Sequence, residues 1–305
     1  MKFGKLADIS GVDFSLPADH DFNHKIFDSP SPQSSLPKVY IGCTGWSMKE
    51  WVGQVYPKGT KTKDYLRAYA KQFNTIELNT THYRIPTVDT IQKWKEESTS
   101  DFKFCPKILQ RISHAKDLGL ESGMLMAFCE AIQGLEEKLG CCFMQMPPYY
   151  GLDRQAALLK FIERFPTHIP LAIELRHESW FADLTAAMPL LEAMRERRMP
   201  LVITDVAGRR DVLHQCLTAP VAMIRFVGNA LVPSDYSRID EWVERLKAWT
   251  ENGLQEVYFF PHEPDNILAP QLAAYLQKQL QSSFVVESRG PNLIDDQKGQ
   301  QISLF

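Results

Sequence analysis

Leu171-Ala172-Ile173-Glu174-Leu175-Arg176 is a short apolar run that ends in charged side chains, and it is one of eight similar runs in this chain of 305 residues. Intervals long enough for a helix separate the runs, which are Val39–Gly42, Thr75–Asn79, Phe102–Lys107, Cys141–Gln145, Leu171–Arg176, Leu201–Asp205, Ala222–Arg225 and Val257–His262. Strands that alternate with helices favour parallel pairing through right-handed crossovers. Eight such units predict a single α/β domain, a closed TIM-like (β/α)₈ barrel, rather than an open sheet.

Two segments lie outside this predicted barrel, which spans residues 39–287. Residues 1–38 form an N-terminal arm whose apolar side chains, among them Phe14, Phe22 and Phe27, predict that it packs on the outside or the bottom of the barrel. Residues 288–300 are polar and contain glycine and proline, so residues 288–305 are predicted to form a short flexible C-terminal tail.

The composition limits the classes of partner. A net charge of −3 at pH 7 argues against a broad nucleic-acid-binding face, so any polyanion would need a local basic pocket. No apolar stretch reaches the roughly eighteen residues that a membrane span requires, and the first residues do not resemble a signal peptide. None of the six cysteines forms a C-x-x-C pair, which favours reduced, buried thiols. We therefore expect a cytoplasmic protein without a membrane partner.

Polar side chains end most of the predicted strands. Side chains alternate along a strand, so Glu77 and Asn79 share one direction, as do Glu174 and Arg176. An outward direction would bury charge beneath the helices at a cost of several kcal/mol. We therefore expect one pocket at the C-terminal mouth of the barrel, formed by Glu77, Lys107, Gln145, Glu174, Arg176, Asp205 and Arg225. The structural alternative is that some of them form inward ion pairs, for instance Glu174 with Arg225.

The residue types at the mouth suggest roles. We assign acid and base catalysis to the carboxylates and to two histidines, which are Glu77, Glu174, Asp205, His114 and His177. Substrate contacts are assigned to amides, cations, a histidine and aromatic residues that could stack a ring, namely Asn79, Gln145, Lys107, Arg84, Arg176, Arg225, His262, Trp46 and Tyr83.

Two chemistries fit these residues. In the first, carboxylates and histidines bind a divalent metal that activates water, while arginine and lysine bind a phosphate. In the second, paired carboxylates act as acid and base on a sugar-like substrate without a metal. Ligands contributed by different strands leave no spacing signature, so both chemistries stay open and a divalent metal is the candidate cofactor.

We therefore predict a barrel enzyme, a hydrolase or a lyase, that acts on a phosphate-bearing or nucleic-acid-derived substrate. One alternative is a non-catalytic module that binds a nucleotide or nucleic acid at the same mouth. A carbohydrate isomerase or hydrolase is a further alternative, which rests on the analogy of fold alone.

An ordered set of motifs carries a family resemblance. They include Ile41–Ser47, Phe73–Arg84, Gln145–Pro148, Glu174–Trp180 and Ile203–Asp205. The set spans residues 39 to 280 and resembles the domain of unknown function 72 (YecE-like) family. That resemblance implies a TIM-like barrel and no settled activity. Two stretches, Arg225–Gly228 and Phe259–Asn266, depart from the family pattern.

The last five residues form a separate motif. Gln301-Ile302-Ser303-Leu304-Phe305 resembles the short peptide with which partner proteins bind the bacterial replication sliding clamp. An apolar Leu304-Phe305 pair can occupy one pocket while Gln301 forms hydrogen bonds at a second. We therefore expect the sliding clamp as a partner.

Overall fold

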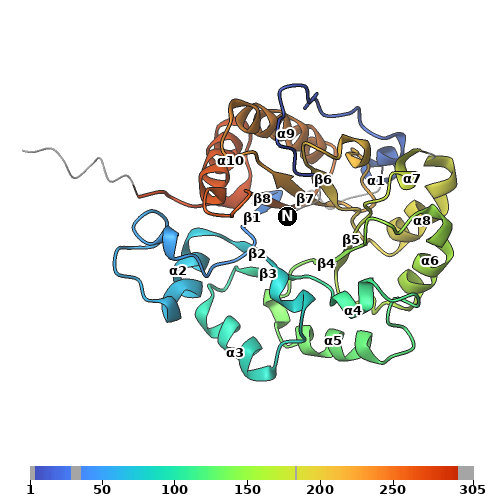
Figure 1. Ribbon diagram of the computed structural model, residues 1–305, viewed down its shortest axis with the longest axis horizontal. Coiled ribbons are helices and arrows are strands. Elements are labelled where there is room, and N and C mark those ends of the chain that lie inside the picture. Colours follow the sequence, from blue (N-terminus) through green and yellow to red (C-terminus); the bar gives the residue numbers. More distant parts are fainter. Residues whose placement is uncertain (1–3, 29–35, 183, 295–305) are drawn as a thin grey trace, which may run out of the picture.

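The computed structural model describes residues 4–28, 36–182 and 184–294, and it has an α/β fold with parallel strands (Figure 1). Each of the eight apolar runs overlaps one strand, and the strands are β1 (Lys38–Ile41), β2 (Thr75–Leu78), β3 (Lys103–Pro106), β4 (Cys142–Gln145), β5 (Leu171–Glu174), β6 (Ile203–Asp205), β7 (Val221–Val227) and β8 (Glu256–His262). The predicted alternation of strands and helices is therefore confirmed except between β6 and β7, where the described chain forms only the short 3-10 helix Arg210–Val212.

The described strands belong to three parallel sheets, with the orders β6-β7-β8-β1-β9, β2-β3 and β4-β5. Single bridges join neighbouring sheets, since Lys107 pairs with Phe143 and Ile173 pairs with Leu201. Between the ends of β1 and β2, the Glu77 amide donates to the Cys43 carbonyl (3.1 Å). In Figure 1 the strands β1 to β8 follow one another around the middle of the molecule, and the helices lie outside them.

The α-helices are α1 (His24–Phe27), α2 (Tyr65–Gln72), α3 (Val88–Glu97), α4 (Gln110–Ser113), α5 (Met124–Gln133), α6 (Gln155–Arg164), α7 (Ser179–Ala182), α8 (Leu184–Glu196), α9 (Pro233–Glu251) and α10 (Ala269–Ser283). Helix α1 precedes β1, and the other α-helices lie in the intervals after the strands. Proline at the first position of α9 suits a helix start, and Asp235 accepts the Val232 amide there (3.2 Å). Within the described ranges, no helix is both long and apolar enough to cross a bilayer.

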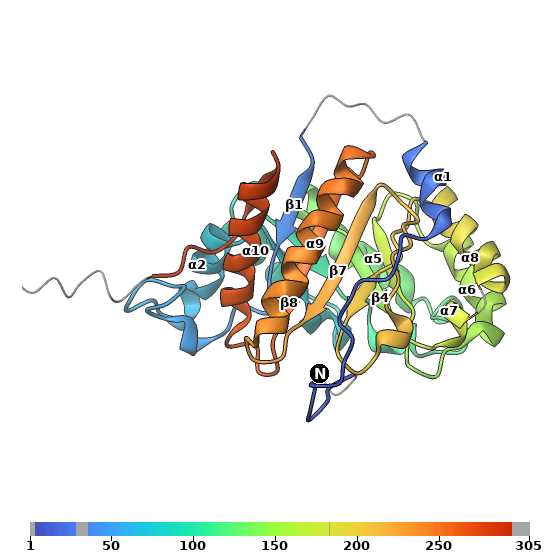
Figure 2. The same ribbon diagram turned by 90° about the horizontal axis from the view of Figure 1, so that it is seen from above.

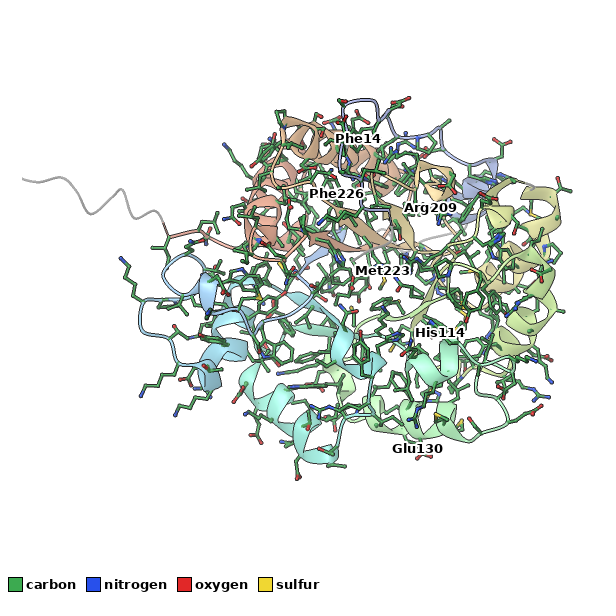
Figure 3. All side chains as sticks on the ribbon, viewed as in Figure 1. Phe14, His114, Glu130, Arg209, Met223 and Phe226 are labelled. Atoms are coloured by element: carbon green, nitrogen blue, oxygen red, sulfur yellow. The ribbon has the colours of Figure 1, made fainter. Side chains whose placement is uncertain are left out.

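Successive side chains of the strands point alternately toward the middle of the molecule, on what we call the inner face, and toward the helices, on the outer face. The inner core contains Tyr40, Cys105, Cys141, Phe143, Ala172, Val202, Met223, Tyr258 and Phe260. Figure 3 shows Met223 near the middle of the molecule and Phe226 further out, toward Phe14 of the arm. Because side chains alternate, Glu174 follows Ala172 and Arg225 follows Met223 on the inner face.

The N-terminal arm packs on the outer side of the molecule, along α9. Gly4 accepts the Gly208 amide just beyond the end of β6 (2.9 Å), and Asp19 accepts the Trp249 indole N–H on α9 (3.0 Å). Figure 2 shows the arm running along α9 from the end of the molecule where β7 and β8 finish to α1 at the opposite end. The start of the arm therefore lies at the C-terminal ends of the strands.

The predicted flexible tail begins too early. Glu287–Arg289 forms strand β9, which pairs in parallel with β1. The Arg289 guanidinium donates to the carbonyls of Ala70 (3.1 Å) and Phe73 (3.0 Å), and the Ile294 amide donates to a backbone carbonyl as well. The boundary at residue 288 is therefore wrong, because backbone pairing and one arginine fix a stretch of polar composition. The peptide Gln301–Phe305 lies outside the described residues.

Candidate functional site

Three fully buried side chains form the centre of a polar network on the inner face. The Arg225 guanidinium binds Glu77 through two parallel contacts, Nε to Oε2 and Nη2 to Oε1, both 2.9 Å long. Its third nitrogen, Nη1, donates to Glu174 Oε2 (2.8 Å). Paired geometry of this kind is the strongest that arginine and carboxylate form. One arginine on β7 therefore joins carboxylates from β2 and β5.

The network extends from Glu174 across two further strands. Gln145 Nε2 donates to Glu174 Oε2 (2.8 Å), and the Lys107 ammonium donates to Gln145 Oε1 (3.0 Å). Arg176 Nε lies 3.6 Å from Glu174 Oε1. Among the described residues, Glu174 Oε1 has no hydrogen-bond partner. One carboxylate oxygen in this network is therefore buried without a hydrogen bond.

On the other side, two residues contact Glu77. Asn79 Nδ2 donates to Glu77 Oε1 (2.9 Å), and His262 Nε2 lies 2.9 Å from Glu77 Oε2. We call the eight residues of this site the inner network: Glu77, Asn79, Lys107, Gln145, Glu174, Arg176, Arg225 and His262. It contains every residue that the sequence placed in the shared pocket except Asp205.

The electrostatics of the inner network favour charged carboxylates and a weakened ammonium. Burial disfavours ionised Glu77, but Arg225 and His262 hold the pKa of that carboxyl well below its ordinary value. Burial opposes the charge of Glu174 in the same way, and Arg225 and Arg176 bring its pKa below the ordinary value. Burial, assisted by the nearby charge of Arg225, lowers the pKa of Lys107 to about 8.

Asp205 does not join the inner network, so its predicted place in the pocket is wrong. It lies on the outer face of β6, where Arg238 Nη2 of α9 is 2.8 Å from Asp205 Oδ1 and the Trp242 indole donates to Oδ2 (2.9 Å). Arg210 also contacts this carboxylate. The expectation failed because two arginines neutralise a charge that would otherwise be costly beneath a helix.

The other predicted residues lie in the surrounding loops. Tyr83 is 76% exposed, and Arg84 and His114 are also exposed. His177 is half-buried, and its Nδ1 lies 2.8 Å from the Ser179 hydroxyl in its own loop. Trp46 is half-buried and packs edge-on against Trp94. The structure places these five residues around the inner network rather than within it.

Sequence reasoning missed one histidine beside the inner network. His82 is 8% exposed, and its Nδ1 lies 2.7 Å from the Ile108 carbonyl in the chain after β3. Burial lowers the pKa of His82 to about 4, and the neighbouring charge of Lys107 acts in the same direction. His82 is therefore neutral at neutral pH. His82 lies three residues after Asn79, just beyond the end of β2, and this position could have indicated that it belongs to the site.

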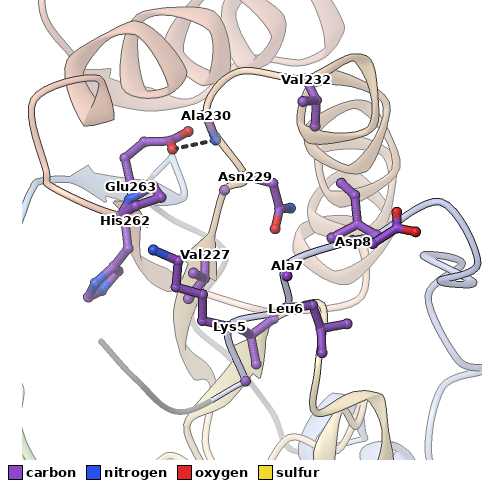
Figure 4. Close-up of a pocket in the computed structure, with 15 residues that line it drawn as sticks. Lys5, Leu6, Ala7, Asp8, Val227, Asn229, Ala230, Val232, His262 and Glu263 are labelled. Carbon is purple, nitrogen blue, oxygen red and sulfur yellow. Dashed lines mark hydrogen bonds between the residues drawn. The ribbon is translucent and has the colours of Figure 1, made fainter.

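A pocket of about 460 Å³ adjoins the inner network (Figure 4). Its walls come from residues 4–9 of the arm and from the loops after β7 and β8, and they include His262. Glu263 lies in the same wall, where it accepts the Ala230 amide (2.8 Å), and burial raises its pKa to about 7. His262 therefore connects the pocket with the inner network. Hydrophobic patterning predicted that the arm packs, but it did not reveal that the arm forms a pocket wall.

The donor set does not fit a divalent metal. Over the described ranges, no group of three or more histidine, cysteine, aspartate or glutamate side chains could bind a metal ion. Glu77 and Glu174, the two inner carboxylates, are both bound by Arg225. The metal-assisted chemistry predicted from the sequence therefore has no ligand set in the part of the chain that the structure describes.

These features define a class of protein, a parallel α/β protein with buried charged residues at the C-terminal ends of its strands. A family model described as "Protein of unknown function DUF72" matches residues 40–293. The chain belongs to this family, which confirms the resemblance seen in the sequence motifs.

Proteins of two other bacteria are similar to this chain in sequence. The "UPF0759 protein YecE" of Escherichia coli K12 is 28% identical over 285 residues, which cover 88% of this chain and 100% of that protein. The "UPF0759 protein YunF" of Bacillus subtilis 168 is 29% identical over 151 residues, or 47% of this chain and 52% of that protein. A solved DUF72 family structure from Enterococcus faecalis V583 has a TM-score of 0.66 at 23% identity and covers 84% of this chain and 100% of that one. At this identity the structural likeness shows the fold alone.

Proposed function

We propose that β1 to β8 close into a (β/α)₈ barrel whose mouth contains the inner network. Backbone pairing between successive strands supports this closure, because the bridges of Lys107 with Phe143 and of Ile173 with Leu201 connect the separate sheets. The contact between Glu77 and Cys43 connects β1 with β2. In barrels of this type the active site lies at the C-terminal ends of the strands.

We further propose that the protein is an enzyme that acts on an anionic substrate, phosphate-bearing or nucleic-acid-derived, by hydrolysis or lyase chemistry. An excess of buried positive charge carries this proposal. Three cations, Lys107, Arg176 and Arg225, stand against two carboxylates, Glu77 and Glu174, which leaves one positive charge before the histidines are counted. A substrate anion would balance that charge. Cationic and amide side chains, which the inner network contains, are the groups that bind such an anion.

The network suggests a division of roles. Lys107 and Arg176 contact the anion, while Arg225 fixes the two carboxylates. Glu174 Oε1, which has no hydrogen-bond partner among the described residues, is the proposed proton acceptor. The pocket of about 460 Å³ holds the rest of the substrate beside His262, and its size lies in the usual range for ligand sites. Exposed Tyr83 supplies a ring on which a base could stack.

Carbohydrate hydrolysis is less well supported. A metal-free glycosidase needs one protonated carboxyl as the acid. Arg225 binds both Glu77 and Glu174 and keeps each pKa below its ordinary value, so this pair does not supply the protonated carboxyl. Glu263, whose pKa is about 7, lies in the pocket wall outside this pair. A binding module would use the same anion contacts without turnover. A cytoplasmic location stays a prediction from the sequence.

Calorimetric titration with inorganic phosphate, a mononucleotide and a sugar phosphate tests the proposal. We expect saturable binding, weakened at least about tenfold in Arg176→Ala, because one charge-assisted contact contributes about 1.5–3 kcal/mol. Arg67→Ala, at an exposed arginine whose charged partner is Asp64, is the matched control and should bind like the wild type. No saturable binding of any probe would contradict the proposal. Binding without turnover in a screen of phosphodiesters and sugar phosphates would favour the binding module.

A second proposal rests on the C-terminal peptide alone. We propose that Gln301–Phe305 binds the bacterial sliding clamp, since Leu304 and Phe305 supply the apolar anchors that such a peptide needs. A synthetic peptide of residues 295–305 should bind purified clamp with saturation in fluorescence anisotropy. Phe305→Ala should remove this binding. Equal signals for the two peptides, or none at high micromolar concentration, would contradict the idea.

A further inference from the structure

Two lysines of this protein are buried to the same degree but are bonded differently. Lys138 is 7% exposed, and its ammonium donates to the Lys95 carbonyl (2.6 Å), the Ser98 carbonyl (2.9 Å) and the Ser98 hydroxyl (3.0 Å). Lys107 is 8% exposed, and within the described residues its ammonium donates one hydrogen bond, to the neutral amide oxygen of Gln145. An ammonium has three donors. Lys138 uses all of them in the fold, whereas Lys107 does not.

The surroundings of Lys107 disfavour its charged form. The side chain extends from the end of β3 on the inner face and lies 5.8 Å from the centre of the Phe143 ring. The charged or titratable groups that face it come from β2, β5 and β7 and from the loops after β2, β3 and β5, and they are Glu77, His82, His114, Glu174, Arg176 and Arg225. Burial and the charges of Arg225 and Arg176 outweigh the opposite effect of Glu77 and Glu174, so the pKa of Lys107 falls to about 8.

We infer that Lys107 is a nucleophile that forms a covalent imine with the carbonyl carbon of an anionic aldehyde or ketone. This inference rests on the proposed function and selects lyase chemistry within it. The neutral amine attacks the carbonyl carbon and a C–N bond forms. The carbonyl oxygen takes up one proton from the amine and one from the medium and leaves as water, and the product is a protonated imine. No oxidant or reductant is needed.

The same geometry suits the intermediate. A protonated imine keeps the positive charge at the Lys107 nitrogen, so the charge balance of the inner network does not change. Gln145 Oε1 still accepts a hydrogen bond at that position, and Gln145 in turn donates to Glu174. Arg176 remains to bind the anionic group of the substrate. The protonated imine withdraws electrons from the neighbouring carbon, which permits cleavage of the next carbon–carbon bond.

Reductive trapping tests the inference on the full-length protein. The protein is incubated with glyceraldehyde 3-phosphate or with pyruvate and cyanoborohydride at pH 7.5, and the lysines that gain mass are mapped by peptide mass spectrometry. A pKa near 8 gives Lys107 on the order of a hundred times more free amine than a surface lysine at this pH. We expect Lys107 to react at least about tenfold faster than the surface lysines. Lys138, equally buried, is the internal control and should not react.

Phosphate binding and trapping, both measured on the wild type, separate the inference from the proposed function. In Lys107→Arg, the arginine keeps a positive charge but cannot form an imine, so trapping at this position should be lost. Trapping in the wild type should also slow when inorganic phosphate is added. If the wild type binds phosphate and Lys107 reacts no faster than surface lysines, the imine is wrong and the proposed function stands. If neither phosphate binding nor selective trapping occurs, both are wrong.

Discussion

Glu174 and Asp205 are the last residues of adjacent strands, both are fully buried, and both are paired with arginine. They differ in the face that they occupy. Glu174 lies on the inner face beside Arg225, and one of its oxygens has no hydrogen bond among the described residues. Asp205 lies on the outer face, where Arg238, Arg210 and Trp242 engage both of its oxygens.

On the outer face, the hydrogen bonds and ion pairs around Asp205 and Arg238 leave neither side chain without partners. Arg238 donates to the Asp205 carbonyl (3.0 Å) and to the Val227 carbonyl (3.0 Å), and its guanidinium lies between the rings of Phe226 and Phe14 at 4.1 Å and 4.9 Å. It fastens α9 and the N-terminal arm to the sheet. Buried charge alone therefore does not identify a reactive site. Incomplete bonding on the inner face is the more informative sign.

The largest effect is expected at Asp205. Asp205→Ala leaves Arg238, which is fully buried, without its main charged partner, so we expect a loss of about 4 kcal/mol in the free energy of unfolding. Urea unfolding followed by circular dichroism measures it. Phosphate affinity of the folded fraction should not change.

The matched control removes an exposed ion pair. Glu136→Ala breaks the contact with Lys95, and because the Glu136 side chain is 64% exposed we expect a loss below about 1 kcal/mol. A loss at Asp205 as small as at Glu136, or a parallel loss of phosphate binding, would erase the distinction between the two faces.

The two buried lysines should respond in opposite directions. Lys138→Met leaves two carbonyls and a hydroxyl without their donor, so we expect a loss of about 3 kcal/mol. Lys107→Met removes a charge that burial disfavours. Because its pKa is about 8 instead of 10.5, the charge of Lys107 destabilises the folded state by about 3 kcal/mol at pH 7. Loss of the hydrogen bond to Gln145 offsets about 1 kcal/mol of this. We therefore expect the free energy of unfolding to rise by about 2 kcal/mol in Lys107→Met.

Guanidinium unfolding of both variants at pH 7 measures these changes. Functional sites often contain residues that lower stability, so a gain in Lys107→Met would agree with a functional role for Lys107. A loss at Lys107 similar to that at Lys138 would show that Lys107 is structural.

The pH dependence of stability gives an independent measure of Lys107. Its pKa is depressed from 10.5 to about 8, so between these values the unfolded chain binds more protons than the folded one. Stability from this group is therefore present above pH 10.5 and is lost as the pH falls through 8. Relative to Lys107→Met, the wild type should gain about 2–3 kcal/mol between pH 7.5 and 10.5. Parallel curves for the two proteins would contradict the depressed pKa.

Much of the inner network could be predicted because it depends on local rules. Apolar runs located the strands, and side-chain alternation placed Glu77, Glu174 and Arg225 on one face at their ends. The ion pair between Glu174 and Arg225 also followed from these positions as the structural alternative. Contacts between strand ends can be predicted once the order of the strands is known.

The errors involve partners that lie outside the strands of the inner network, where side-chain alternation along a strand gives no information. Arg238, which neutralises Asp205, comes 33 residues later, on helix α9. The sequence of α9 does not show which of its arginines points toward the sheet. In strand β9, Arg289 donates hydrogen bonds to the carbonyls of Ala70 and Phe73, more than 200 residues earlier in the sequence. The pocket wall at residues 4–9 has the same origin, since an apolar pattern indicates packing but not the surface on which it occurs.

The smallest change in stability is expected at Glu174, together with a large change in function. Glu174→Gln keeps the shape of the side chain and an oxygen that accepts from Arg225 and Gln145, while Arg225 retains both contacts to Glu77. We therefore expect a loss of only about 1 kcal/mol in the free energy of unfolding, or a few degrees in the melting temperature.

The Glu174→Gln substitution makes the inner network more positive by one charge, so phosphate should bind as well as before or more tightly. The proposed proton acceptor is lost, so turnover of any phosphate ester found in the screen should fall by at least about a hundredfold. Calorimetry measures the melting temperature and the affinity on the same samples. Weaker phosphate binding together with a large drop in melting temperature would instead make Glu174, like Asp205, part of the framework.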